Sequence, residues 1–279
     1  MSPGVLFLVL AGAFLHALWN VIVKGGSEKL YELGINALGA GLCAFMLVFF
    51  VPLPQGESIW LLPLSALFHF LYYLSMAGAY RAADLTLCYT VMRGSAPMLT
   101  ALALLACGSN LPLSGWAGIS LLCAGIFCLA LQAARLAGAQ SRGIIYALRT
   151  ALAITAYTLA DGFGARLSGN GFSYCVWLFI LNIAPINAWL LLKSGSNYGA
   201  YLRKRARIGL AGGLASFLSY GIAIWAMTVA PIALVAGLRE TSVIFAMLLA
   251  VLFLGERLTP LRVSAVALVA AGAVLARLG

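Results

Sequence analysis

Residues 231–254 read PIALVAGLRETSVIFAMLLAVLFL, a run that is apolar throughout except for Arg239 and Glu240 near its middle. A membrane-spanning helix needs about 20 mostly apolar residues. Each charge at the centre of such a helix costs roughly 2.5–3.5 kcal/mol on insertion scales. Since the chain keeps both charges in spite of this cost, we expect them either to serve function or to complete a buried structural network.

The composition indicates that the lipid bilayer is the solvent for this chain. Hydrophobic residues make up 63% of its 279 residues and charged residues 9%, and the mean hydropathy is +1.04. Soluble domains are about 45–50% apolar and about 25% charged, and one of this size has no single core large enough for so much apolar surface. The sequence therefore predicts an integral membrane protein.

The apolar runs are long and continuous, which predicts helices rather than the short alternating strands of a barrel. The expected fold class is an all-α polytopic membrane protein with ten transmembrane helices. The first run lacks the basic residues that begin a secretory signal, so we expect it to be a span. The expected ranges are 4–23, 33–53, 60–80, 85–106, 112–132, 144–161, 172–192, 208–228, 231–254 and 259–276.

Lys and Arg outnumber Asp and Glu by 17 to 7, and their placement predicts topology rather than nucleic-acid binding. They gather in the connectors after the first, third, fifth, seventh and ninth predicted helices, while the other side carries only Arg166 and Arg277. By the positive-inside rule the basic side faces the cytoplasm, and both termini lie outside. The cluster at 203–205 either marks this topology alone or also touches anionic head groups.

Enzyme chemistry finds little support in the sequence. The six cysteines lie in apolar segments without CxxC spacing, and His16 and His69 have no carboxylate or thiolate nearby in the chain. The motifs HExxH, GxSxG and GxGxxG and the P-loop are absent. We therefore expect no metal site, no cofactor and no catalytic residues.

The chain divides at the linker 133–143, with five predicted helices on each side. An odd number of spans inserts the second half upside down relative to the first, as in many secondary transporters. We expect a first repeat over 1–132 and a second over 144–279. YTVMRGSAP (89–97) and VAGLRETSV (235–243) then place Arg93 and Arg239 at equivalent depths.

Four stretches of the chain carry a family resemblance: HALWNVIVK (16–24), AYRAADLTLCYTVMRGSAPMLTAL (79–102), AYTLADGFGAR (156–166) and LRETSVIFAMLLAVLFLGERLT (238–259). They resemble the EamA-type, ten-helix members of the drug/metabolite transporter superfamily. The resemblance implies two five-helix inverted repeats around a central cavity, with small organic solutes moved by alternating access. Gly255 and Glu256 have no counterpart after the fourth predicted helix. Because members carry amino acids, drugs or other metabolites, the resemblance leaves the solute open.

Arg93, Arg239 and Glu240 are the first site candidates. Adjacent residues point about 100° apart around a helix, so Arg239 and Glu240 need separate partners. Glu240 is expected to pair with Arg93 of the other repeat, which leaves Arg239 free to bind a solute carboxylate through its planar guanidinium. Alternatively, the three side chains form a closed network that only sets helix register.

Helix faces supply further candidates. His16, Trp19 and Asn20 share one face of the first predicted helix and line the cavity, or Trp19 belongs to an interfacial belt and Asn20 bridges to a neighbouring helix. Tyr157 and Asp161 are four residues apart on the sixth helix.

Asp161 is either an interfacial cap or a cation or proton site. Tyr89 and Trp225 complete the set of substrate and gating candidates.

We expect a secondary transporter of small organic metabolites, with amino acids or other carboxylate-bearing solutes as candidates and export as the expected direction. Glu240 or Asp161 offers proton coupling, although a facilitator would show the same features. The alternatives are an exporter of lipophilic cations, a membrane-bound enzyme and a non-transporting membrane subunit. The expected setting is a bacterial inner membrane, where the chain contacts its solute and lipid, but no nucleic acid, as a monomer or homodimer.

Overall fold

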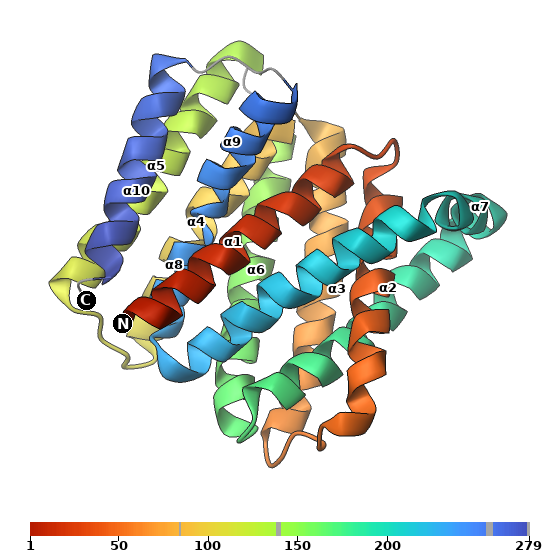
Figure 1. The fold of residues 1–279 in the computed structure, drawn as a ribbon. Coiled ribbons are helices and arrows are strands. Elements are labelled where there is room, and N and C mark those ends of the chain that lie inside the picture. Colours follow the sequence, from red (N-terminus) through yellow and green to blue (C-terminus); the bar gives the residue numbers. More distant parts are fainter. Residues whose placement is uncertain (84, 138–140, 255–258, 278–279) are drawn as a thin grey trace.

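The computed structural model describes residues 1–83, 85–137, 141–254 and 259–277, and its regular elements over these ranges are all helical (Figure 1). By length and composition, eight helices of the described part could cross a membrane. The expected polytopic all-α class is confirmed, while the count of ten spans stays a prediction. The elements are α1 (Pro3–Lys24), α2 (Lys29–Leu47), η1 (Val48–Phe50), α3 (Ser58–Ala82), α4 (Leu85–Ala106), α5 (Leu113–Ala137), α6 (Ser141–Leu167), α7 (Gly171–Val229), α8 (Ile232–Arg239), α9 (Ser242–Leu254) and α10 (Pro260–Arg277).

Helix α7 covers two of the predicted spans, 172–192 and 208–228, together with the connector between them. The chain runs out and back, as Figure 1 shows at the right, and it turns at Gly195. There φ is 42° and ψ is −116°, a conformation that glycine adopts without the clash a Cβ would cause. The segment AYLRKRAR (200–207) that follows is rich in good helix formers, which explains why the expected connector is helical.

The run 231–254 is interrupted at its two charges. Helix α8 ends at Arg239, and α9 begins at Ser242. Between them the backbone forms a tight turn, because the N–H of Glu240 donates to the carbonyl of Gly237 at 3.0 Å and that of Thr241 to Leu238 at 3.1 Å. The single helix expected over this run is therefore corrected to two helical segments joined by an i to i−3 turn.

Helices of the first half pack mainly on helices of the second: α2 on α7, α3 on α6, α5 on α10, and α1 on the returning part of α7. Glycines make the α2–α7 contact close, since a Cβ on Gly39 would lie 2.4 Å from the carbonyl oxygen of Gly209. A two-fold axis between the halves would map the α3–α6 pair onto the pair of α1 and the returning part of α7. The same axis would map the α2–α7 and α5–α10 pairs onto themselves. The packing thus supports the two-repeat division at 133–143, which remains a prediction.

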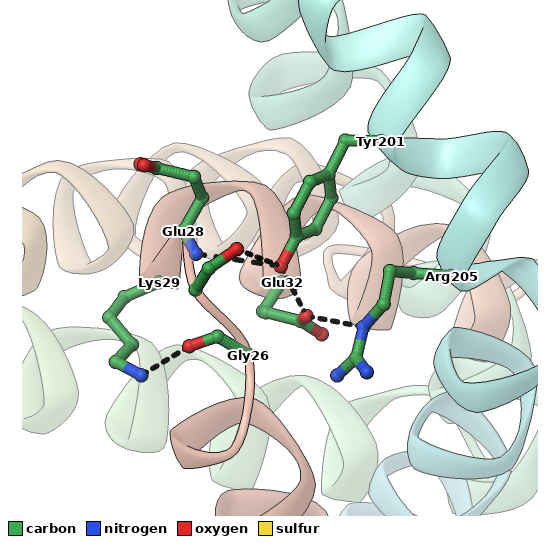
Figure 2. A network of polar contacts seen from close by, with 7 residues as sticks. Gly26, Glu28, Lys29, Glu32, Tyr201 and Arg205 are labelled. Atoms are coloured by element: carbon green, nitrogen blue, oxygen red, sulfur yellow. Dashed lines mark hydrogen bonds and ion pairs between the residues drawn. The ribbon is translucent and has the colours of Figure 1, made fainter.

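A polar network joins the start of α2 to the returning part of α7 (Figure 2). Glu32 is 1% exposed, and its Oε1 accepts from the Tyr201 hydroxyl at 2.7 Å and from Nε of Arg205 at 2.8 Å. The N–H of Glu28 donates to the same hydroxyl at 3.4 Å. Glu32 is one helical turn from Asn36, which lines the cavity described below, so the network lies close to that cavity.

Candidate functional site

A cavity of about 50 Å³ lies where α1, α2, α3, α6, α7 and α8 meet. Typical small-molecule sites have about 300–1,000 Å³, so a solute enters this one only if its walls move. The walls are mostly aromatic and amide side chains with a single formally charged residue among those described. The lining residues are His16, Trp19, Asn36, Ala37, Ala40, His69, Tyr72, Tyr73, Tyr157, Phe179, Asn182, Ser216, Tyr220 and Arg239.

Aromatic rings from three helices form one wall. His69 of α3 stacks on Tyr157 of α6 with the centroids 4.0 Å apart and the planes 19° from parallel. The Tyr157 ring meets Tyr72 and Tyr220 edge-on, at 5.8 and 6.0 Å. Such contacts hold the rings in fixed orientations and present their faces and edges to the space between them.

Arg239 is the charged residue of the cavity. It is the last residue of α8 and is 7% exposed. Its guanidinium carbon lies 4.7 Å from the centroid of the Tyr220 ring, a cation–π contact, and its buried Nε has no hydrogen-bond partner. Within the described ranges no carboxylate lies at ion-pair distance from it.

Arg93 of α4, in contrast, is neutralised by contact. Its Nε lies 2.7 Å from Oε2 of Glu240, with both side chains 5% exposed, and its Nη2 donates to the Ser242 hydroxyl at 3.0 Å. The Nε–H does not point at the carboxylate, so this contact is a close ion pair rather than an aligned hydrogen bond. The predicted contact between Glu240 and Arg93 is therefore present, and the adjacent residue Arg239 is directed elsewhere.

Asp161 lies in the interior of α6 and is fully buried. Its two carboxylate oxygens accept from tyrosine hydroxyls of α7: Oδ1 from Tyr174 at 3.2 Å and Oδ2 from Tyr220 at 2.5 Å. These are side-chain partners inside the bundle, so Asp161 does not cap a helix at the membrane surface. Tyr220 separates it from the cavity that Arg239 lines.

The remaining candidates divide into those at the cavity and those away from it. His16 and Trp19 line it, and Nε1 of Trp19 donates to Nδ1 of His16 at 3.3 Å. Asn20 instead donates to the backbone carbonyl of His16 at 2.7 Å and is not among the lining residues. Tyr89 lies beside Arg93, with its ring centroid 5.9 Å from the guanidinium carbon. Trp225 is 38% exposed and lies outside the lining.

Sequence reasoning missed Tyr220, which contacts both Arg239 and Asp161. Its local sequence, LSYGIA (218–223), offers only a polar aromatic between small residues, a pattern shared by other positions in the spans. The predicted site residues also include none from α3, although His69 and Tyr72 line the cavity. The expectation about Gly255 and Glu256 falls on residues outside the described ranges.

Comparisons with known proteins agree with this architecture. The EamA-like transporter family is matched over residues 141–278, a range that begins inside the predicted linker. The crystal structure of another protein superposes with a TM-score of 0.75 at 18% identity, over 98% of this chain and 95% of that one. At this identity the likeness concerns the fold alone. No curated protein matches the chain.

Proposed function

Because residues 141–278 match the EamA-like transporter family, we propose that this integral, multi-pass membrane protein is a secondary transporter of small organic solutes that bear a carboxylate. The observation that carries the proposal is the Arg239 guanidinium, which lines the cavity without a contacting carboxylate among the described residues. A planar guanidinium binds a carboxylate through two parallel hydrogen bonds. A solute carboxylate supplies the partner that Arg239 lacks.

The charges around the cavity favour an anionic group over a cation. Glu240 is already paired with Arg93, so the charge left facing the cavity is the positive one of Arg239. A lipophilic cation would meet like charge in a medium where charge is poorly screened. The aromatic wall of His69, Tyr157 and Tyr72 is suited to the apolar part of such a solute, as in an amino acid.

The proposal includes alternating access, because the cavity is too small for a metabolite as it stands. Helix α8 ends at Arg239 in a turn, and interrupted helices near the midplane are typical of substrate sites in secondary transporters. We place the chain in a bacterial inner membrane, with export as the direction that the family resemblance favours.

The test is ligand-dependent thermal stability of the purified protein. Glutamate, phenylalanine, lactate and tetraphenylphosphonium are each added to the wild type, to Arg239→Gln and to Arg149→Gln. Arg149 is the matched control, since its guanidinium lies 5.7 Å from the Tyr146 ring on an exposed part of α6. A ligand at 100 times its Kd stabilises the folded state by about 2.7 kcal/mol. We expect a carboxylate to stabilise the wild type and Arg149→Gln, but not Arg239→Gln.

Two results would contradict the proposal. Equal stabilisation of the wild type and Arg239→Gln by a carboxylate would show that Arg239 is not the recognition group. Stabilisation of both by tetraphenylphosphonium alone would replace the carboxylate carrier with an exporter of lipophilic cations.

A further inference from the structure

Tyr220 connects the buried carboxylate of Asp161 to the buried guanidinium of Arg239. Its hydroxyl donates to Oδ2 of Asp161 at 2.5 Å, and its ring centroid lies 4.7 Å from the guanidinium carbon. In the described part of the chain, neither Asp161 nor Arg239 has an ion-pair partner in direct contact.

Among the described residues, the formal charges buried at the centre of the bundle balance. Arg93 and Arg239 each carry a formal positive charge, and Glu240 and Asp161 each carry a formal negative charge when ionised. Glu240 neutralises Arg93 by contact, so the charge left to compensate Arg239 is that of Asp161, held one tyrosine away. Net charge buried in an apolar medium is costly, and a solute carboxylate at Arg239 would add one negative charge to this balanced set.

We propose that Asp161 is a proton-binding site that fills when a solute carboxylate occupies Arg239. The solute takes Arg239 as its counter-charge. A hydronium ion from the solvent then transfers a proton to one carboxylate oxygen of Asp161, so that one O–H bond of hydronium breaks, a new O–H bond forms and water is released. Asp161 becomes a neutral acid, and the bundle is neutral again. The inference rests on the proposed function and specifies its coupling: one proton travels with each carboxylate solute, in the same direction.

The groups around Asp161 favour Asp161 as the group that accepts the proton. Tyrosine hydroxyls can donate to an ionised carboxylate and accept from a protonated one, so both forms keep their partners. The nearest rival is His69, whose Nδ1 lies 3.0 Å from the Ser65 carbonyl and whose protonation would add positive charge near Arg239. The titratable and charged groups that face Asp161 are Tyr174, Cys175 and Tyr220 of α7, Tyr157 of its own helix and Arg239 of α8, with the Ser65 hydroxyl and His69 on α3.

The experiment needs no solute, because Arg239→Gln removes the same positive charge that a bound carboxylate would neutralise. Infrared spectra of the purified protein at neutral pH report protonated carboxyl groups by their C=O stretch, which shifts in D₂O. We expect one additional carboxylic-acid band in Arg239→Gln relative to the wild type. The band should be lost in Arg239→Gln/Asp161→Asn and should not appear in the charge-conserving variant Arg239→Lys.

Absence of the band in Arg239→Gln, or its persistence in the double variant, would overturn the inference, and persistence would place the proton on another group such as Glu240.

A stability cycle covers the case in which Arg239→Gln folds poorly. Asp161→Asn should lower the thermal stability, and Asp161→Asn/Arg239→Gln should recover part of the loss because it is again neutral. Strictly additive losses would also overturn it. Since neither measurement uses a solute, either can fail while the recognition role of Arg239 stands.

Discussion

The two buried arginines differ in what lies beside each guanidinium. Arg93 contacts a carboxylate and a hydroxyl, those of Glu240 and Ser242, whereas Arg239 contacts the face of Tyr220. Removing one partner of a buried ion pair leaves the other charge buried without compensation, which is strongly destabilising. The contacts of Arg93 therefore favour a structural role. Those of Arg239 favour a role that depends on whether a solute occupies the cavity.

This difference predicts the stability of Glu240→Gln. The substitution leaves the Arg93 guanidinium buried and unpaired, and removing one member of a buried pair costs about 3–5 kcal/mol. The double variant Arg93→Met/Glu240→Gln removes both charges and should unfold at a higher temperature than Glu240→Gln. Thermal unfolding of the single and double variants in detergent measures the coupling. Equal losses from Arg93→Met and Glu240→Gln that simply add would show that the pair contributes no interaction energy.

At the scale of elements, glycine positions decide how closely α2 and α7 approach. A Cβ on Gly213 would lie 2.3 Å from the backbone nitrogen of Ala40, an atom that cannot move without displacing α2. Gly199, on the same element, has no heavy atom within 4 Å of the corresponding position. Both glycines lie in α7, but only Gly213 is packed closely against another helix.

We predict opposite effects of alanine at these two positions. Gly213→Ala overpacks the interface and should lower the free energy of unfolding by about 1–3 kcal/mol. Gly199→Ala meets no contact and should raise it by about 0.5–1 kcal/mol, because alanine loses less conformational freedom in a helix. Thermal unfolding of both variants in the same detergent decides the matter. A similar change in both would show that the close approach of α2 and α7 is not limiting.

At the scale of the whole molecule, the turn of α7 lies at the end of the bundle where several basic residues are exposed. Around the turn at Gly195, the exposed basic residues are Lys193, Arg203, Lys204 and Arg207. Arg205 instead forms an ion pair with Glu32. In the view of Figure 1, the start of α1 and the last described turn of α10 both lie on the side of the bundle opposite the turn of α7. Of the basic residues at 203–205, Arg205 thus joins α7 to α2, while Arg203 and Lys204 remain exposed.

The charge bias predicts which end faces the cytoplasm. Cys107, exposed between α4 and α5, should react with a membrane-impermeant maleimide in intact cells when the other five cysteines are replaced. A cysteine introduced at the exposed Ser196, beside the turn of α7, should react only after the cells are permeabilised. The reverse pattern would invert the orientation, and labelling of both sites in intact cells would exclude a single orientation.

The sequence by itself determined the solvent, the helical class and the identity of the costly charges. Hydropathy and span length are properties of contiguous residues, so they can be read without knowing what packs against what. Arg93, Arg239 and Glu240 stood out for the same reason, since a charge in an apolar run is unusual wherever the helix lies.

Only the tertiary structure decided how these groups are partnered. It set Glu240 beside Arg93, placed Tyr220 between Asp161 and Arg239, and interrupted the run 231–254 at Arg239. Each of these facts depends on the distance and rotation between helices that are far apart in the chain, such as α4 against the turn after α8 or α6 against α7. Helix rotation follows from the packing of small residues across many contacts, and no single stretch of sequence contains that information.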